Sequence, residues 1–337
     1  MGIKHLNRFL LKNCTNQSIQ SKYDLSNLRD KTIAIDISIY LHKFIEEEAL
    51  LENMYILIRT LLSLSIHPLF IFDGKPPTEK KECLYLRKQN RKETEKKLAD
   101  IQNNMSLVNS TEEQKKWNNQ IQYFKRQLIK INDSHIQYAK QIIDAFGLQY
   151  IVAEGEADRL CSQLVLYGEA WACLSDDMDM FAYGCPRVLR CLDLTMKYAH
   201  LYDLPQILTD LSMNMTNFRQ LIVMSGTDYN YYQKDNTTVF VGMPLESAMN
   251  LYYTGFLVSG TTQTKTMFDW LIETQYPIDV SYLEKVCALF TITEKPNISA
   301  IYNVPSVMDF TQIYTLLKGE GFIFLNTPTT IDSLCNK

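Results

Sequence analysis

Residues 67–77, with the sequence HPLFIFDGKPP, join a short apolar run to an acid and a turn. The run from His67 to Phe72 is rich in aromatic and branched side chains and predicts a β-strand. Asp73 follows directly, and the segment Gly74-Lys-Pro-Pro77 predicts a turn, with a helix beginning at or after the prolines. An acid is thereby placed at the carboxyl end of a strand.

Strands of the same kind are expected on both sides of this segment. The expected strands are residues 31–36, 67–73, 148–152, 170–174 and 188–192, and the expected helices are 3–11, 39–64, 134–146, 155–167 and 178–183. Strands that alternate with helices predict a mostly parallel, doubly wound sheet and an α/β fold. A polar loop is expected after the first helix, and a mainly helical part after Asp203.

Residues 78–130 differ in composition from the rest of the chain. They contain thirteen Lys or Arg and seven Asp or Glu, a local net charge of +6 in a chain whose formal net charge is −4. Apolar residues are sparse between Lys80 and Gln120, which predicts long polar helices with a break near residues 103–110. The segment is either a solvated helical hairpin or a surface for an anionic partner.

The overall composition is that of an ordinary globular protein. Hydrophobic residues make up 46% and charged residues 21%, and no apolar run is long enough to span a bilayer or to form the core of a signal peptide. The eight cysteines include no Cys-x-x-Cys pair, which favours reduced, buried thiols. We expect an intracellular protein, nuclear or cytoplasmic, without membrane contact.

Acidic residues gather at the carboxyl ends of the predicted strands. Seven stand at or just after a strand or a comparable apolar segment: Asp36, Asp73, Glu154, Glu156, Asp177, Asp179 and Asp228. Ligands of an open parallel sheet bind outside these strand ends, so the acids should converge on one crevice. Asp36 or Asp177 alone could equally be a helix N-cap, but capping does not explain the joint pattern. Asp158 and Asp176 are expected to lie outside this set.

Seven carboxylates in one crevice would repel one another, and several would stay protonated. Divalent cations remove this conflict, and Mg²⁺ combines a few carboxylates with phosphate oxygens. Two such ions roughly 4 Å apart can stabilise both the attacking and the leaving oxygen of a phosphodiester. The sequence offers no catalytic triad or Gly-rich phosphate loop as a competing explanation. The acids therefore predict phosphodiester hydrolysis with two metal ions.

The chain resembles the flap endonuclease/XPG family of structure-specific 5′ nucleases. The resemblance rests on MGI at residues 1–3, AIDISIYLHKF at 34–44, FIFDGKPP at 70–77, AEGEAD at 153–158, SDDMDMFAYG at 175–184 and SGTDY at 225–229. It implies a PIN-like α/β fold with a mostly parallel sheet. It also implies two Mg²⁺ ions, for which Mn²⁺ can substitute, and cleavage of DNA near a 5′ flap or a free 5′ end.

The resemblance also assigns roles to individual residues. The metal ligands would be the seven acids Asp36, Asp73, Glu154, Glu156, Asp177, Asp179 and Asp228. Lys80 and Arg87 fall where the family places two basic residues over the scissile phosphate, and residues seven apart share one helix face. Residues 78–130 would form a helical arch through which a single strand passes. Contacts with DNA are expected from Gly2, His42, Lys81, Arg91 and Gly242.

The chain departs from the family pattern at three places. His42 stands where the family usually has an aromatic residue that stacks on a substrate base. Residues 239–248, VFVGMPLESA, correspond to a helix-hairpin-helix, but Leu and Glu replace expected basic residues. Residues 326–337 contain no sliding-clamp peptide, so clamp recruitment is not expected. These traits resemble those of the divergent family members carried by large DNA viruses.

Four regions are predicted. They are an N-terminal nuclease region at 1–100, a helical arch at 78–130, an internal nuclease region at 131–235, and a divergent helix-hairpin-helix with a helical C-terminal part at 225–337. The predicted function is that of a metal-dependent 5′ flap endonuclease and 5′→3′ exonuclease on branched or nicked DNA in replication, repair or recombination. Two alternatives stay open: a non-catalytic DNA-binding or scaffold protein, and a PIN-type ribonuclease. The oligomeric state is not predicted.

Overall fold

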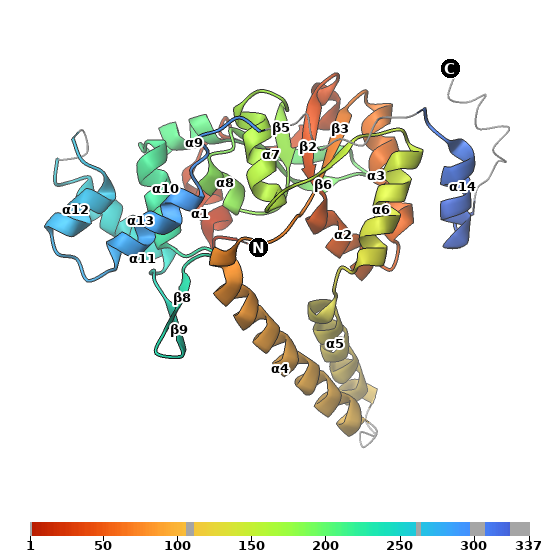
Figure 1. Ribbon diagram of the computed structural model, residues 1–337, viewed down its shortest axis with the longest axis horizontal. Helices are drawn as coiled ribbons and strands as arrows, with labels where there is room; N and C mark the ends of the chain where they lie inside the picture. Colours follow the sequence, from red (N-terminus) through yellow and green to blue (C-terminus); the bar gives the residue numbers. More distant parts are fainter. Residues whose placement is uncertain (1, 106–110, 261–263, 297–306, 324–337) are drawn as a thin grey trace.

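A seven-stranded sheet forms the centre of the molecule (Figure 1). The computed structural model describes residues 2–105, 111–260, 264–296 and 307–323. The strand order is β1-β7-β6-β5-β2-β3-β4. The strands are β1 (Ile19–Asp24), β2 (Thr32–Asp36), β3 (His67–Phe72), β4 (Tyr150–Val152), β5 (Ala172–Leu174), β6 (Arg187–Asp193) and β7 (Tyr198–Asp203).

Five neighbouring strands run parallel, which confirms the predicted α/β fold. β2 pairs in parallel with both β3 and β5, and β4 and β6 extend the parallel part on either side. The chain builds β2, β3 and β4 in one direction and then crosses back to add β5 and β6 on the other side of β2. Strand order therefore reverses between β2 and β5, and the crevice outside their carboxyl ends is where such a sheet binds ligands.

The sequence-based expectation missed the two antiparallel strands at one edge. β7 pairs antiparallel with β6, and β1 pairs antiparallel with β7. β1 lies in the segment expected to be a polar loop. Its residues after Ile19 are exposed or only half-buried, so an edge strand there shows no apolar alternation for a prediction to detect.

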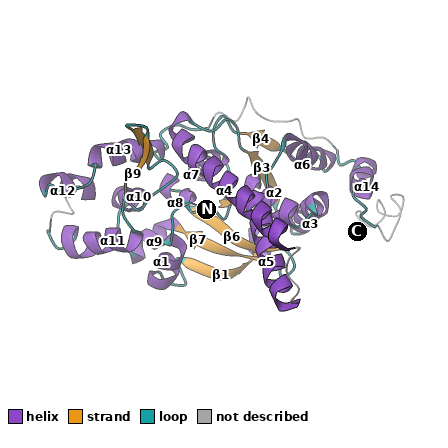
Figure 2. Cartoon of the chain, turned by 90° about the horizontal axis from the view of Figure 1, so that it is seen from below, coloured by secondary structure: helices purple, strands orange, loops and turns teal. Residues whose placement is uncertain are grey.

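Helices lie on both sides of the sheet (Figure 2). They are α1 (Leu6–Asn13), α2 (Ile37–Glu46), α3 (Leu50–Ser63), α4 (Lys81–Met105), α5 (Thr111–Leu128), α6 (Asp133–Ala145), α7 (Ala157–Leu166), α8 (Asp179–Tyr183), α9 (Leu204–Asp210), α10 (Met215–Met224), α11 (Leu245–Asn250), α12 (Met267–Glu273), α13 (Val280–Leu289) and α14 (Phe310–Gly319). The prediction of a single helix over residues 39–64 was wrong, because Glu48 adopts a positive φ of 55° between α2 and α3. The apolar periodicity continues across this break and conceals it.

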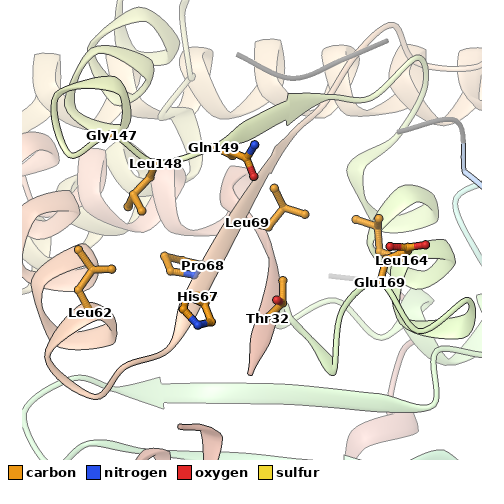
Figure 3. A pocket seen from close by; sticks show the side chains of 10 residues that line it. All are labelled: Thr32, Leu62, His67, Pro68, Leu69, Gly147, Leu148, Gln149, Leu164 and Glu169. Atoms are coloured by element: carbon orange, nitrogen blue, oxygen red, sulfur yellow. The ribbon is translucent and has the colours of Figure 1, made fainter. Parts of the chain in front are cut away.

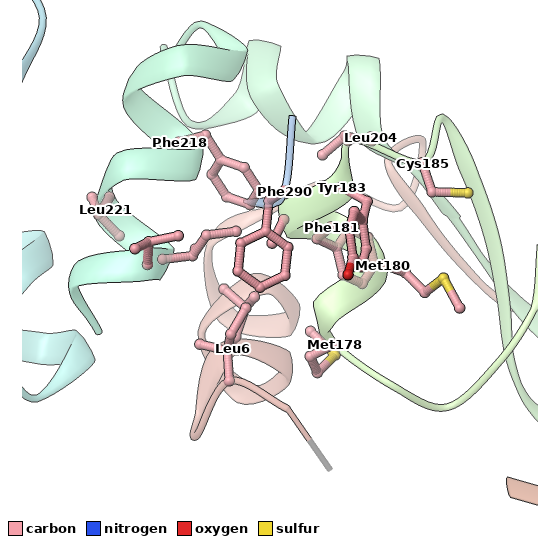
Figure 4. Close-up of a cluster of buried hydrophobic side chains, with 14 of the residues drawn as sticks. Leu6, Met178, Met180, Phe181, Tyr183, Cys185, Leu204, Phe218, Leu221 and Phe290 are labelled. Atoms are coloured by element: carbon pink, nitrogen blue, oxygen red, sulfur yellow. The ribbon is translucent and has the colours of Figure 1, made fainter. Parts of the chain in front are cut away.

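Side chains on the two faces of the sheet enter different cores. Within β2, Ala34 belongs to one buried cluster, and Ile33 and Ile35 belong to the other, as the two-residue period of a strand requires. Figure 4 shows part of the first cluster, in which Phe181 and Tyr183 of α8 lie near Leu6 and Phe290. The short helix α8 is therefore held on several sides by buried apolar side chains, and Asp179 is its first residue.

Two long helices, α4 and α5, project together from the body of the molecule (Figure 1). They confirm the predicted polar helices of residues 78–130; the predicted break at 103–110 lies largely outside the described residues. An antiparallel hairpin of β8 (Tyr231–Lys234) and β9 (Thr237–Phe240) stands beside the start of α4. It occupies part of the segment expected to form a helix-hairpin-helix, and that motif stays a prediction, as do the domain boundaries.

Several other expectations concern the chain as a whole. The seven cysteines in the described ranges are free thiols; four of them are buried, and Cys14, Cys191 and Cys287 are not. No helix in those ranges has the length and apolar character needed to cross a bilayer. The tail at 326–337, expected to carry no sliding-clamp peptide, lies outside the described residues.

Candidate active site

Six of the seven predicted acids lie at or just after the carboxyl ends of four neighbouring strands, and the seventh, Asp228, follows helix α10. Asp36 is the last residue of β2, and Asp73 follows β3 directly. Glu154 and Glu156 follow β4, and Asp177 and Asp179 follow β5. The order β5-β2-β3-β4 makes these strands neighbours whose carboxyl ends face the same edge. The topology thus explains why acids far apart in the sequence reach one place.

Two serines fix the positions of Asp36 and Asp73. The Ser175 hydroxyl donates to Asp36 Oδ2 at 3.0 Å, and the Ser38 backbone N–H donates to Asp36 Oδ1 at 3.2 Å. The Ser38 hydroxyl donates to Asp73 Oδ2 at 2.6 Å, and the Ala157 N–H donates to Asp73 Oδ1 at 2.8 Å. Asp36 is therefore both the N-cap of α2 and a member of the acid group, so the two interpretations of this residue do not exclude each other.

The chain start closes over the acids of the β5 loop. Asp177 Oδ1 accepts from the Asp179 N–H at 3.1 Å. Gly2 has a φ of 77°, and a Cβ placed there would lie 2.2 Å from Asp177 Oδ1 and 2.6 Å from Asp179 Oδ1. Only glycine fits such close contact in this backbone conformation. The family resemblance predicts a DNA contact for Gly2, and the structure places this glycine against two of the predicted metal ligands.

Two loops of the acid group pack backbone against backbone. The Gly74 N–H donates to the Gly155 carbonyl at 2.8 Å, and a Cβ at Gly74 would lie 1.8 Å from the Ala153 carbonyl oxygen. A side chain at this position would force the loops after β3 and β4 apart. Gly74 therefore allows Asp73 and the Glu154–Glu156 loop to sit next to each other.

The beginning of the α4 segment brings two cations into the acid group. The Lys80 ammonium pairs with Glu156 Oε1 and, at 2.9 Å, with Asp228 Oδ2. Arg87 Nη2 donates to both oxygens of Asp228 at 2.6 and 2.7 Å. The Lys80 side chain is only 13% exposed, whereas that of Arg87 is 47% exposed. The seven-residue spacing thus directs both cations to one carboxylate, one deep in the site and one at its rim.

Two nearby side chains make contacts that the sequence did not predict, and a third, Asp158, lies among the acids. The Tyr229 hydroxyl donates to Glu156 Oε2, and the Cys83 thiol lies 3.4 Å from Asp228 Oδ1. Asp158, expected to lie outside the acid set, has a buried Oδ1 atom without a hydrogen-bond partner among the described residues. Asp158 and Tyr229 lie within two residues of predicted acids in the sequence, and this closeness was the feature from which they could have been predicted.

Burial and mutual repulsion set the protonation of the acids. Burial, followed by the negative charge of Asp73, raises the pKa of Asp36 to about 7. Burial and the charges of Asp177 and Asp228 raise the pKa of Asp179 well above its usual value. Burial also acts on Asp228, but the positive charges of Lys80 and Arg87 hold its pKa below the usual value. Carboxylates without a cation are thus the ones that resist ionisation.

The chemistry of these residues fits divalent cations. All the candidate metal-ligating atoms are carboxylate oxygens, which Mg²⁺ prefers. Asp179 also has a buried Oδ1 atom with no hydrogen-bond partner in the described part of the chain. In their present arrangement, no three His, Cys, Asp or Glu side chains in those ranges are placed so that they could hold a metal ion together. Lys80 and Arg87 already pair with Glu156 and Asp228, so metal ions bound there would displace these cations or bind beside them.

Other residues named from the sequence lie near or outside this group. Glu154 is exposed, and no hydrogen bond or ion pair joins it to the other six acids within the described ranges. His42 is half-buried on α2, and Lys81 is exposed at the start of α4. Arg91 donates to the Leu128 carbonyl of α5, so it ties α4 to α5. The DNA contacts predicted for these residues stay predictions.

A cavity lies at the opposite edge of the sheet, away from the acids. It measures about 430 Å³ and is lined by residues at the amino ends of β2 and β3 and just before β4, among them Thr32, His67 and Gln149 (Figure 3). None of the predicted site residues lines it. We place the candidate site at the acids because charged groups, buried carboxylate oxygens and the switch point of the sheet coincide there. The cavity near Thr32 and His67 is distinguished only by its size.

Two family models match the chain over the regions that build the site. The XPG N-terminal domain matches residues 1–94, and the XPG I-region matches residues 147–228. Flap endonuclease 1 of Candida glabrata is 30% identical over 248 residues, which cover 68% of this chain and 61% of that protein. Flap endonuclease 1 of Glycine max is 28% identical over 68% of this chain and 62% of that protein. The chain thus matches about three fifths of the length of these curated relatives.

Solved structures share the fold. The catalytic core of Rad2 in complex with a DNA substrate superposes with a TM-score of 0.64 at 19% identity, covering 95% of this chain and 96% of that one. Flap endonuclease-1 from Methanococcus jannaschii gives a TM-score of 0.58 at 20% identity, covering 94% and 95%. The order of strand-end acids, the two matching family models and the sequence relatives agree, and the chain belongs to the flap endonuclease/XPG family.

Proposed function

We propose that the chain is a divalent-metal-dependent 5′ flap endonuclease with 5′→3′ exonuclease activity on branched or nicked DNA. The observation that carries the proposal is that Lys80 and Arg87 pair with Glu156 and Asp228 beside the acids at the switch point of the sheet. The relatives are named flap endonuclease 1, and the Rad2 core was solved with a DNA substrate. An enzyme with this activity would cleave DNA intermediates of replication, repair or recombination.

Two Mg²⁺ ions, or Mn²⁺ in their place, would be held by Asp36, Asp73, Glu154, Glu156, Asp177, Asp179 and Asp228. A related solved structure, the Holliday junction-resolving enzyme GEN1, is described with product DNA and a Mg²⁺ ion. The ions would stabilise the negative charge on the attacking and leaving oxygens of the phosphodiester. Ser38 and Ser175 hold the acids at fixed positions, and Gly2 closes one side of the site.

The chain's own cations would bind the scissile phosphate. Lys80 and Arg87 now satisfy Asp228, and a phosphate between them would offer the same kind of oxygen partner. A guanidinium can bind such a group through two parallel hydrogen bonds. When the acids bind metal, the ammonium and guanidinium become available for the substrate. The positive charge of residues 78–130 would favour the approach of the strand.

The first test is cleavage of a labelled 5′-flap duplex. We expect incision near the flap junction in Mg²⁺ or Mn²⁺, and none in EDTA. Matched RNA flaps and unbranched duplexes belong in the same assay. Faster cleavage of RNA would favour a ribonuclease, and tight binding of branched DNA without turnover in any divalent metal would favour a non-catalytic scaffold. Either result would contradict the proposed function.

Tyr229→Phe should raise the Mg²⁺ concentration needed for cleavage by roughly ten- to a hundredfold, as for other residues that hydrogen-bond a metal ligand. The substitution removes the hydroxyl that donates to Glu156 but keeps the ring, which packs edge-on to Phe290 at 5.4 Å. Mg²⁺ titrations of cleavage rate measure the effect. Tyr253→Phe is the matched control, because its hydroxyl bonds the remote Leu211 carbonyl. Equal titration curves for both variants would contradict a positioning role.

A further inference from the structure

We propose that the cavity beside Asp228 binds one nucleobase of the substrate strand, next to the scissile phosphate, and that the base stacks on Phe240. The inference rests on the proposed function and names a contact that the acids and cations do not provide. It concerns the hairpin β8–β9, which overlaps the segment expected to form a helix-hairpin-helix.

The cavity lies between four parts of the chain. It measures about 240 Å³ and is lined by Gly2, by Leu86 and Arg87 of α4, by Asp228, and by Tyr231 and Phe240 of the hairpin. Gln233 of β8 donates to Glu82 of α4 at 2.7 Å, which fixes the hairpin against this helix. This volume is several times the volume that one water molecule occupies in the liquid, about 30 Å³. It has room for a planar group.

Phe240 is held in place although its side chain is 44% exposed. A Cβ at Gly226 or at Gly242 would lie 2.8 Å from the Phe240 ring, so both glycines leave space for it. The ring of Tyr231 lies 5.2 Å away, tilted by 49°. An aromatic ring fixed against backbone and still open to solvent is pre-organised for a flat partner. Gly242 makes room for this ring, and the DNA contact expected of Gly242 itself stays a prediction.

The chemistry of the lining suits a nucleobase attached to a phosphate. Phe240 and Tyr231 offer aromatic faces, on which any base can stack. Arg87, which lies at the rim of the acid group, also lines the cavity, and Lys4 adds a second cation. A phosphate bound by Arg87 would place the neighbouring base of the same strand at the cavity. The cavity is continuous with the proposed catalytic site through Asp228, and this continuity selects the substrate strand as its occupant.

The test combines changes in the protein with changes in the DNA. Two 5′-flap duplexes carry an abasic analogue, one on each side of the scissile phosphate, and a third is unmodified. Each is cut by the wild type, Phe240→Leu and Phe240→Trp. Leucine keeps an apolar side chain over the glycines but has no aromatic face. Tyr167→Ala is the matched control, an exposed aromatic at the far end of α7 from Glu156.

For the wild type, we expect that loss of the base on one side lowers kcat/KM about tenfold, in the range measured for base–aromatic stacking. Phe240→Leu should lower kcat/KM on the unmodified flap by a similar factor, and its further loss on the abasic flap should be less than about twofold. Phe240→Trp should keep wild-type behaviour. The control should respond to the abasic analogue as the wild type does.

Independent losses, in which the effects of Phe240→Leu and of the abasic analogue multiply, would overturn the proposal, because a merely structural ring gives this result. Wild-type kcat/KM for Phe240→Leu would also overturn it. Melting temperatures establish that the variants are folded, and if Phe240→Leu is not, Phe240→Met takes its place. Failure of the wild type to cut any flap would instead reject the proposed function, so the two failures are distinct.

Discussion

Asp177→Ala combined with Asp179→Ala is expected to lower Mg²⁺-dependent cleavage of a 5′-flap duplex by roughly a thousandfold or more. Metal-ion stabilisation of transition-state charge is worth several kcal/mol, and each 1.36 kcal/mol changes the rate tenfold. The two side chains follow β5 at the switch point, and Asp179 Oδ1 has no hydrogen-bond partner among the described residues. Single-turnover rates on the flap substrate measure the loss.

The same double substitution should not weaken the fold when metal is absent. Burial and the charges of Asp177 and Asp228 raise the pKa of Asp179. A carboxyl whose folded pKa lies above its unfolded pKa destabilises the fold once the pH exceeds the unfolded value. In EDTA at neutral pH, the variant should therefore melt at the same temperature as the wild type or higher. Mg²⁺ should raise the melting temperature of the wild type but not of the variant.

Asp176→Asn provides the matched control, one residue away in the same loop. The Asp176 carboxylate accepts from the Cys191 N–H at 2.7 Å, and an amide oxygen can keep this bond. We expect near wild-type cleavage and a normal Mg²⁺ response. The hypothesis of a metal site fails if the Asp177 and Asp179 double variant cleaves normally. A loss of activity in Asp176→Asn as large as in the double variant would show that the loop as a whole, rather than its two acids, is required.

The sequence was most informative where one residue type follows several strands. Asp36, Asp73 and Asp177 could be assigned to one edge because apolar runs end at or just before them, and parallel strands end together. Burial, together with the negative charges of neighbouring acids, raises the pKa values of Asp36 and Asp179, which is the direction that the expected repulsion among the acids requires. These inferences depend on local pattern and topology, both of which a sequence carries.

Contacts made across the fold could not be predicted in this way. Nothing in the sequence pairs Ser38 with Asp73, or Arg91 with the carbonyl of Leu128, because such partners depend on how loops and helices pack. The hairpin β8–β9 was missed because its residues are exposed or half-buried and have no clear alternation. The residues that would select a substrate thus depend on the elements that sequence patterns resolve least.

Lys80→Met is expected to lower kcat by roughly a hundred- to a thousandfold, the usual effect of removing one group that stabilises transition-state charge, with a smaller change in KM. Methionine keeps the long apolar stem while it removes the ammonium. The Lys80 side chain is 13% exposed and lies between Glu156 and Asp228, so no neighbouring lysine can take its place without moving the helix. Lys88→Met is the control, because Lys88 is exposed on α4, the helix that begins directly after Lys80.

The effect of Lys80→Met on stability should be opposite in sign to that of the aspartate pair. Removal of the ammonium leaves Glu156 and Asp228 partly buried with less opposing charge, and such uncompensated charges destabilise a fold. In EDTA, the melting temperature should fall below that of Lys88→Met, and Mg²⁺ should restore most of the difference because it replaces the lost charge. A variant that regains its stability in Mg²⁺ but not its kcat would assign Lys80 to the chemical step. If Mg²⁺ restored both the stability and the kcat, Lys80 would act only as a replacement for the metal charge. Arg87 would then be the cation that binds the phosphate.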